Sequence, residues 1–212
     1  MKKYKSILFD LDGTLTDSGE GITKSVVYAF ENLHLKAPDE KDLRLFIGPP
    51  LSQMFPRFGV PENETDTAIR YFRDRYTKTG KFENRPYDGI EDLLKVLKEK
   101  GKELYVATSK PEHTAVEILK HFHLDRYFDA IAGATESHDR ETKDAVIAYL
   151  LNKAHADHCV MIGDTEYDVS GAKRLGIPCI GVSWGFGNPE EMKEAGAIQI
   201  VDTPEELKRI LI

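Results

Sequence analysis

The chain has 212 residues, of which 41% are apolar and 31% charged, as in ordinary globular proteins. This length suffices for one core domain with a sizeable insertion, or for two small domains. Its 29 Lys and Arg stand against 36 Asp and Glu, and the net charge of -7 argues against nucleic acid or an anionic membrane as the main partner.

The N-terminal residues are basic, but the apolar stretch that follows them ends at Asp10, too soon for the hydrophobic region of a signal peptide. No apolar run in the sequence approaches the length of a membrane span. Cys159 and Cys179 each lie in an apolar, strand-like run, so we expect both to be buried thiols. Unpaired cysteines are typical of a reducing compartment, and we expect a cytoplasmic protein.

The first predicted element is a short buried strand over residues 5–9, which ends at Asp10 and is followed by the turn residue Gly13. Alternate side chains of a strand share a face, so Asp10 and Asp12 could point the same way. Two close carboxylates beside an apolar core repel each other and resist burial. A divalent metal ion would balance them most simply.

Residues 17–81 predict helices and no strand. Asp17 and Ser18 are suited to cap a helix whose apolar face carries Ile22, Val26, Val27, Phe30 and Leu33. Further helices are expected from residue 39 toward residue 46, over 51–58 and over 64–79. The intervening Gly48, Pro49 and Pro50 cannot continue a helix.

From Pro86 onward, strands and helices alternate. Strands are expected over 104–108, 128–132, 159–162, 178–182 and 197–201, and helices over 88–100, 112–121, 143–151, 169–175 and 204–211. Continuous apolar strands alternating with helices indicate a parallel sheet covered on both faces, an α/β fold. The helical stretch interrupts this alternation after the first strand, so it is an insertion and the core is discontinuous.

Polar residues gather where the predicted strands end, the edge at which open parallel sheets bind ligands. Each group alone has an ordinary explanation as a helix cap or a solvated charge. Their occurrence in this order, each after an apolar strand or its loop, favours a functional site. The groups are Asp10 with Asp12, Thr108 with Ser109 and Lys110, Arg140 to Lys143, and Gly163 with Asp164 and Asp168.

This order of motifs resembles the haloacid dehalogenase-like (HAD) hydrolase superfamily, and within it the phosphoglycolate phosphatase-like subgroup with a helical cap. Residues 10–14 match the first motif, Thr108 and Ser109 the second, Lys143 the third and residues 163–168 the fourth. The resemblance covers essentially the whole chain. It implies a Rossmann-like core formed by residues 1–16 and 82–212, with an inserted all-helical cap over residues 17–81.

The resemblance also implies roles in a phosphatase. Asp10 would be the nucleophile that forms an aspartyl-phosphate, and Asp12 the general acid and base. Mg²⁺ would be bound by Asp10, the Asp12 carbonyl and Asp164, with Asp168 beside them. Thr108 and Lys143 would stabilise the transferring phosphoryl group. The expected substrate contacts are Ser109 and Lys110 in the core and Arg44, Gly48 and Pro49 in the cap.

Several alternatives stay open at this level. Many relatives carry Lys-Pro at the third motif, whereas this chain has Lys143-Asp144, so Arg140 or Lys110 could share the cationic role. The expected partner is a small phosphorylated metabolite, phosphoglycolate-like, a 5'-nucleotide or pyrophosphate, bound to a monomer or homodimer. A sugar phosphomutase would use the same aspartyl-phosphate. A phospho-acceptor receiver module is the non-enzymatic alternative, although it would need neither the insertion nor Asp12.

Overall fold

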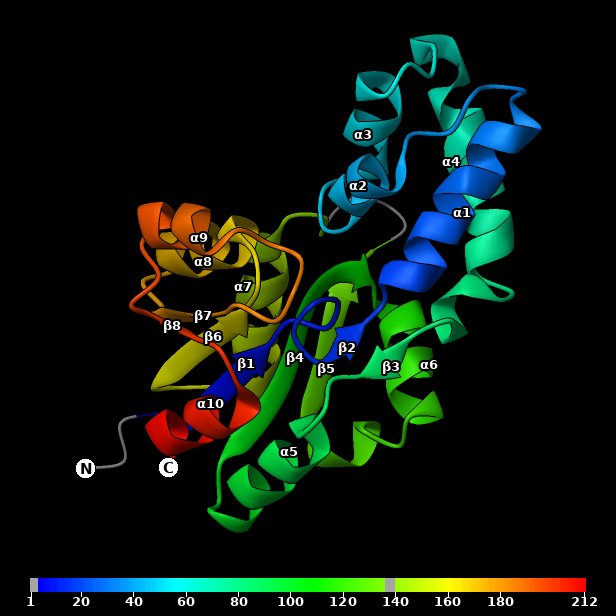
Figure 1. Ribbon diagram of the computed structural model, residues 1–212. Coiled ribbons are helices and arrows are strands. Elements are labelled where there is room, and N and C mark those ends of the chain that lie inside the picture. Colours follow the sequence, from blue (N-terminus) through cyan, green and yellow to red (C-terminus); the bar gives the residue numbers. More distant parts are fainter. Residues whose placement is uncertain (1–3, 136–139) are drawn as a thin grey trace. The chain divides into compact units, whose positions relative to one another are not determined.

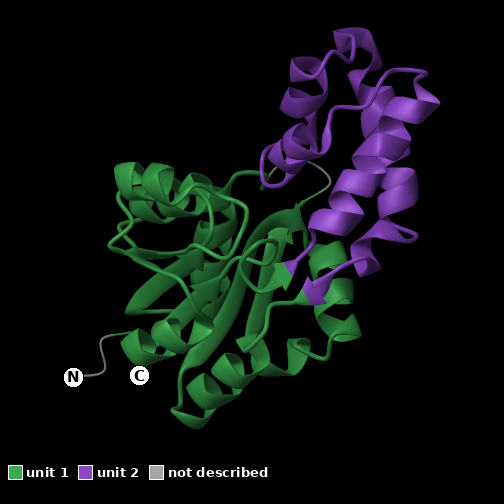
Figure 2. Ribbon diagram, viewed as in Figure 1, with its two compact units in different colours: residues 1–16, 86–212 green, residues 17–85 purple. Residues whose placement is uncertain are grey.

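The structure is a computed structural model that describes residues 4–135 and 140–212. The chain divides into two compact units, one formed by Met1–Thr16 with Pro86–Ile212 and the other by Asp17–Arg85 (Figure 2). We call them the core unit and the cap unit. The cap unit ends at Arg85, four residues beyond the expected residue 81, because Glu83 is bound to Arg75 of the same unit, with 2.7 Å between Nη1 and Oε2.

The core unit is built on a parallel sheet of six strands in the order β5-β4-β1-β6-β7-β8 (Figure 1). The strands are β1 (Ser6–Phe9), β4 (Glu103–Pro111), β5 (Ala130–Ala134), β6 (Cys159–Gly163), β7 (Cys179–Val182) and β8 (Gln199–Val201). From β1 the sheet continues on one side to β4 and β5 and on the other side to β6, β7 and β8. The carboxyl ends of β1, β4 and β6 are therefore neighbours at the point where the strand order reverses.

Helices cover both faces of the sheet, and the alternation of side chains along β1 explains the two layers. Ile7 and Phe9 belong to one apolar cluster, with α5 (Ile90–Glu99), α6 (Glu112–His121) and α10 (Pro204–Leu211). Leu8 belongs to the other, with α7 (Lys143–Ala154), α8 (Glu166–Arg174) and α9 (Pro189–Ala195). The predicted α/β parallel sheet is thereby confirmed.

Strand β4 differs most from the prediction, because it continues three residues beyond Thr108 to Pro111. Its pairing with β5 advances four residues, from Ala107 to Pro111, while β5 advances two, from Ala132 to Ala134. Two extra residues therefore bulge from β4 between Thr108 and Lys110. A bulge redirects side chains that a regular strand would alternate between its faces.

Other differences concern element ends. Helix α8 begins at Glu166, three residues before the expected start, because Thr165 and Asp168 form a reciprocal capping box. Strand β5 begins at Ala130 rather than 128, and the short 3-10 helix η4 (Asp125–Tyr127) comes shortly before it. The structure also contains elements that were not predicted, namely α9 and the two-residue strands β2 (Thr16–Asp17) and β3 (Arg85–Pro86), which pair with each other.

The cap unit is helical, comprising α1 (Gly19–Asn32), α2 (Glu40–Leu43), α3 (Leu51–Arg57) and α4 (Thr65–Tyr76) with the 3-10 helices η1 (Arg44–Phe46), η2 (Glu62–Glu64) and η3 (Gly80–Phe82). Its apolar centre includes three mutually contacting rings, with centroids of Phe30 and Phe55 5.8 Å apart and those of Phe46 and Phe55 5.4 Å apart. This centre allows the insertion to form its own compact unit.

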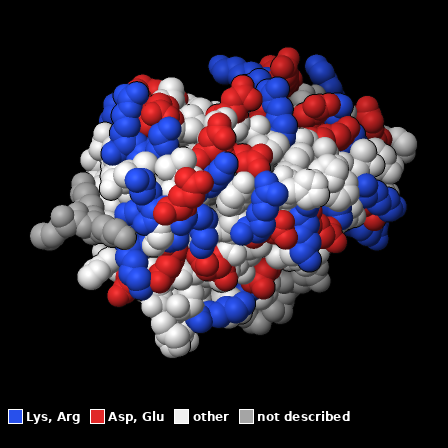
Figure 3. All heavy atoms as spheres, turned by 90° about the horizontal axis from the view of Figure 1, so that it is seen from below, with Lys and Arg blue, Asp and Glu red and all other residues white. Residues whose placement is uncertain are grey.

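The surface carries interspersed charges of both signs, as one face of the molecule illustrates (Figure 3). Several of these charges pair, such as Lys98 with Asp129 at 2.8 Å and Arg126 with Glu91 at 2.5 Å. Among the described residues, none of the helices is long and apolar enough to cross a membrane.

Candidate active site

Asp10 and Lys143 meet at the carboxyl end of β1. Asp10 directly follows β1, and its backbone N–H donates to the carbonyl of Ile162 at 2.9 Å. Lys143, the first residue of α7, is buried and its Nζ lies 2.7 Å from Oδ1 of Asp10. The same ammonium donates to the carbonyl of Ala107 at 3.0 Å and lies 2.8 Å from Oδ1 of Asp168. One cation thus contacts two acids and a strand end.

Asp164 and Asp168 follow β6, and each is held by neighbours. Oδ1 of Asp164 accepts from the Thr14 hydroxyl at 3.1 Å, and its Oδ2 accepts from the backbone N–H of Phe186 at 2.9 Å. Oδ2 of Asp168 accepts from the backbone N–H and the hydroxyl of Thr165, which leaves Oδ1 for Lys143. Asp168 therefore orients the lysine.

Asp10, Asp164 and Asp168 form a buried carboxylate cluster in which one oxygen of each lies within 4.8 Å of the others. Burial raises the pKa of Asp10 to about 6 although Lys143 opposes the shift, and burial followed by repulsion from Asp168 and Asp10 raises the pKa of Asp164 well above its usual range. Burial disfavours the charged lysine, but Asp10 and Asp168 raise the pKa of Lys143. One ammonium does not balance three carboxylates.

Glycines let the backbone approach this cluster. Gly13 has φ +83°, and a Cβ built on it would lie 2.1 Å from Oδ2 of Asp164. A Cβ on Gly185 would lie 2.4 Å from the same oxygen. A larger residue at either position would displace Asp164, so these glycines are required by the packing around the carboxylate.

Asp12 lies beside the cluster but has a different cation. Its Oδ2 lies 2.7 Å from Nζ of Lys110, whose side chain is 7% exposed. Its Oδ1 is buried without a hydrogen-bond partner among the residues that the structure describes. Thr108, which is buried, accepts at its hydroxyl from the backbone N–H of Lys110 at 3.2 Å. The bulge of β4 thus places Thr108 and Lys110 at the same edge as Asp12.

Arg140 is engaged away from the carboxylate cluster. Its Nη2 lies 2.6 Å from Oε2 of Glu112, its Nε donates to the carbonyl of Gly133 at 2.7 Å, and its guanidinium lies 3.7 Å from the ring centre of Tyr149. Ser109 is exposed on the bulge. In this structure, the cation beside the predicted nucleophile is Lys143, whereas Arg140 holds β5 to the start of α6.

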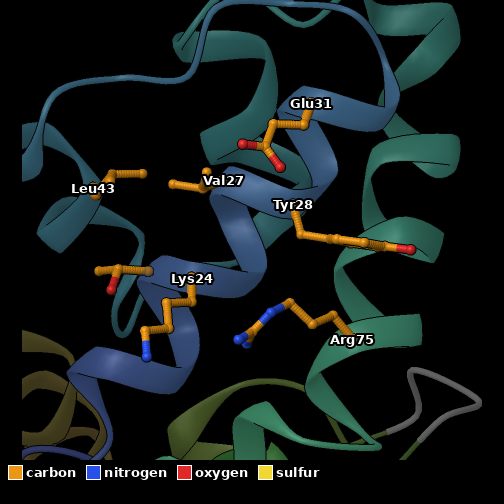
Figure 4. Close-up of a pocket in the computed structure, with 7 residues that line it drawn as sticks. Lys24, Val27, Tyr28, Glu31, Leu43 and Arg75 are labelled. Carbon is orange, nitrogen blue, oxygen red and sulfur yellow. The ribbon is translucent and has the colours of Figure 1, made fainter.

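The predicted cap contacts lie in the cap unit: Arg44 and Gly48 are exposed, and Pro49 is partly buried. Gly48 has φ +105°, which explains a glycine at this turn. A separate hollow of about 330 Å³ opens between α1, α2 and α4 (Figure 4). It is lined by Thr23, Lys24, Val27, Tyr28, Glu31, Leu43 and Arg75. No motif in the sequence predicted this hollow.

The residues that hold Asp164 were not predicted from the sequence. Thr14 uses its hydroxyl for Asp164, and its carbonyl accepts from the indole N–H of Trp184 at 3.1 Å. Phe186 supplies a backbone N–H to the same carboxylate. The available signal was the glycine-rich run over residues 185–187, which is typical of close backbone approach.

A family model for "haloacid dehalogenase-like hydrolase" matches residues 7–182, which is most of the chain and includes every acid of the cluster. The chain belongs to the haloacid dehalogenase-like hydrolases. The resemblance drawn from the motifs is therefore confirmed. The matched proteins include phosphatases, and this chain is a phosphatase of the family.

Two similar proteins match nearly the full length. A 5'-nucleotidase of Pseudomonas aeruginosa is 47% identical over 194 residues, which cover 90% of this chain and 88% of that protein. A solved structure from Clostridium acetobutylicum, described as a predicted phosphatase, is also 47% identical and has a TM-score of 0.92, with 98% of each chain covered. The fold and the helical insertion are thus shared with proteins of known structure.

More distant relatives carry other activities. The tyrosine-protein kinase PtkA of Mycobacterium tuberculosis is 35% identical over 209 residues, covering 97% of this chain and 72% of that protein. Phosphoglycolate phosphatase 1 of Pseudomonas aeruginosa is 26% identical over 211 residues, covering 95% and 77%. The family relationship therefore indicates phosphoryl chemistry and leaves the substrate open.

Proposed function

We propose that this protein is a Mg²⁺-dependent phosphatase that hydrolyses a small phosphate monoester through an aspartyl-phosphate on Asp10. The observation that carries the proposal is the buried contact of 2.7 Å between Asp10 and Lys143, beside Asp164 and Asp168. A lone surface carboxylate would be a poor nucleophile, whereas an acid buried next to a fixed cation can meet a phosphoryl group without prior reorganisation.

The proposed reaction has two steps. In the first, an oxygen of Asp10 attacks phosphorus, the ester P–O bond breaks, and Asp12 donates a proton to the leaving oxygen. In the second, water attacks the phosphorus of the aspartyl-phosphate, Asp12 takes the proton from the water, and the bond to Asp10 breaks to release phosphate. Lys143 and Thr108 stabilise the phosphoryl oxygens during both transfers.

The carboxylate cluster fits a magnesium ion. Hard carboxylate oxygens are the protein ligands that Mg²⁺ takes, and one oxygen each of Asp10, Asp164 and Asp168 lies within 4.8 Å of the others beside the ammonium of Lys143. Asp10, the Asp12 carbonyl and Asp164 would hold the ion, with Asp168 beside them. A bound Mg²⁺ would neutralise charge on the phosphoryl group and on the acids.

A nucleoside 5'-monophosphate is our first candidate substrate, and phosphoglycolate and pyrophosphate follow. The support is the 47% identity to a 5'-nucleotidase, compared with 26% to a phosphoglycolate phosphatase. The motif resemblance alone favoured a phosphoglycolate-like ester. The test is a screen of the purified protein with Mg²⁺ against nucleoside monophosphates, phosphoglycolate, pyrophosphate and sugar phosphates. Faster hydrolysis of phosphoglycolate than of any nucleotide would reverse this order.

The same screen tests the reaction type. A hydrolase releases inorganic phosphate continuously, a mutase returns the phosphoryl group to a sugar phosphate, and a receiver module or a kinase retains or transfers it. We expect continuous release from an added ester and no net transfer from ATP to protein tyrosine. Stoichiometric phosphorylation without turnover would contradict a phosphatase.

We also propose that the cap unit selects the substrate. Arg44 and Gly48 are the candidate contacts, and binding energy from the remote part of a substrate is expressed in kcat/KM. Arg44→Ala and Gly48→Val should lower kcat/KM for the best natural ester much more than for p-nitrophenyl phosphate. Arg70→Ala is the matched control, because Arg70 is an exposed arginine of α4 in the same unit. Equal losses on both esters would exclude this loop as the selector.

A further inference from the structure

Lys110 and Asp12 form a nearly buried ion pair that the proposed mechanism does not use. Nζ of Lys110 lies 2.7 Å from Oδ2 of Asp12, with the two side chains 7% and 16% exposed. The other oxygen, Oδ1, is buried and has no hydrogen-bond partner within the described part of the chain. The contact with Lys110 orients the carboxylate of Asp12. A buried polar atom without a partner is costly, so Oδ1 is suited to meet a polar group of a ligand.

The fold fixes Lys110 on the side of Asp12. Two extra residues bulge from β4 between Thr108 and Lys110, and Pro111 then pairs with Ala134 of β5. The backbone N–H of Lys110 donates to the Thr108 hydroxyl at 3.2 Å, and this hydrogen bond joins the two ends of the bulge. A bulge of this kind changes the direction of one side chain, here that of Lys110, while the strand stays paired on both sides of the bulge.

Glu112, Arg140 and Gly133 hold the segment of chain that follows Lys110. Glu112 accepts from Nη2 of Arg140 at 2.6 Å and from the backbone N–H of Gly133 at 3.2 Å. A Cβ on Gly133 would lie 2.5 Å from the carbonyl oxygen of Lys110, so only glycine permits this approach. The backbone of Lys110 is therefore anchored to both β5 and α6.

We propose that Lys110 is a positioning residue that holds Asp12 by Oδ2 and so presents Oδ1 to the leaving oxygen of the substrate. This inference rests on the proposed phosphatase mechanism, in which Asp12 is the general acid and base. Lys110 then acts through Asp12, and its loss lowers the rate of proton transfer while leaving phosphoryl binding intact. The competing interpretation is that Lys110 binds a phosphoryl oxygen directly, as the sequence analysis expected.

The two interpretations predict different kinetics for Lys110→Met. An alkyl phosphate needs a proton on its leaving oxygen, whereas p-nitrophenyl phosphate does not, because its leaving oxygen is already stable as an anion. Positioning predicts a kcat about 10–100-fold lower on the alkyl ester, a smaller loss on the aryl ester and nearly unchanged KM on both. Direct phosphoryl binding predicts a similar rise in KM or fall in kcat/KM on the two esters.

A double-mutant cycle with Asp12→Asn makes the test specific. If Lys110 acts through Asp12, then Lys110→Met in the Asp12→Asn background causes little further loss on the alkyl ester. Full additivity of the two losses would overturn the proposal. Lys110→Gln, which keeps a hydrogen-bond donor, should lose less than Lys110→Met, and it serves as the working variant if Lys110→Met is poorly folded.

Lys102→Met is the matched control. Lys102 is a buried lysine immediately before β4, at the opposite end of this strand from the bulge, and its Nζ donates to the carbonyl of Tyr4 at 2.5 Å. It should lower stability without changing the ratio of rates on the two esters. Failure of the wild-type protein to hydrolyse either ester with Mg²⁺ would contradict the proposed function, whereas normal hydrolysis with a substrate-independent effect of Lys110→Met contradicts only this inference.

Discussion

Nζ of Lys143 lies 2.7 Å from Oδ1 of Asp10, a contact that joins residues 133 positions apart in the chain. The ammonium also contacts Asp168, whose second oxygen is held by Thr165. The nucleophile proposed here is therefore positioned by a chain of contacts from α8 through α7 to the end of β1. Asp10, Lys143 and Asp168 are all buried, so removal of Lys143 leaves the buried carboxylates without their cation.

Asp164 and Asp168 should differ in their effects on metal dependence. We expect Asp164→Ala to raise the Mg²⁺ concentration for half-maximal activity by about 10–100-fold, because a direct ligand is lost. Asp168→Ala should mainly lower kcat, because it releases Lys143. Activity titrated against Mg²⁺ after removal of metal with EDTA separates the two variants. Equal Mg²⁺ requirements in both variants, or full activity in EDTA, would contradict the assigned ligands.

Gly13→Ala should damage the site as well as the fold. A Cβ at Gly13 would meet Asp164 at 2.1 Å in a backbone of φ +83°, whereas Gly101 has φ +70° with nothing within 4 Å of its Cβ. Both substitutions should lower the free energy of unfolding by about 1 kcal/mol through backbone strain. Only Gly13→Ala should also lower kcat and raise the Mg²⁺ requirement. Normal kinetics of a folded Gly13→Ala protein would show that the approach to Asp164 is dispensable.

The pair of Glu83 and Arg75 should make the stability of the cap unit depend on pH. Hydrogen bonds from Arg75 lower the pKa of Glu83 below its ordinary value of 4.5, despite partial burial. A lowered carboxyl pKa contributes stability above pH 4.5 that is lost as the pH falls through the folded-state pKa. We expect Glu83→Gln to cost about 1 kcal/mol at pH 7.

Thermal unfolding between pH 7 and pH 3.5 tests this prediction. The difference between wild type and Glu83→Gln should be constant down to about pH 5 and should narrow below it. Glu205→Gln is the control, because Glu205 pairs with Lys208 on the exposed face of α10 and should give a smaller difference. A difference that widens at low pH would contradict the role of Glu83.

The sequence predicted the core well where apolar periodicity and motif order coincide. Residues 6–9 are apolar apart from Ser6 and lead directly into Asp10, so the strand and the acid at its end follow from the pattern. The approach of Lys143 to Asp10 came from the order of motifs in the family. No local property of residue 143 indicates a partner 133 positions away.

The sequence did not predict the bulge in β4. The predicted strand ends at Thr108, because the polar Ser109 and Lys110 follow it. Pairing with β5 nevertheless continues to Pro111, because the ion pair of Glu112 and Arg140 holds the two strands together. Such a contact depends on tertiary structure. Helix α9 was predictable from the sequence, because Asn188 as the cap and Pro189 at the first turn are typical of a helix start.

The central claim is that Asp10 carries the phosphoryl group, and its most direct test is acid quenching of Asp12→Ala with a ³²P-labelled aryl phosphate. The aryl ester does not require the general acid, and the missing base slows breakdown of the intermediate, so the label should accumulate on the protein. We predict a stoichiometric burst of aryl alcohol and a hydroxylamine-sensitive label on the peptide that contains Asp10. The label should be absent from Asp10→Asn with Asp12→Ala. Turnover without label on that peptide, or normal turnover of Asp10→Asn free of deamidation, would contradict the account.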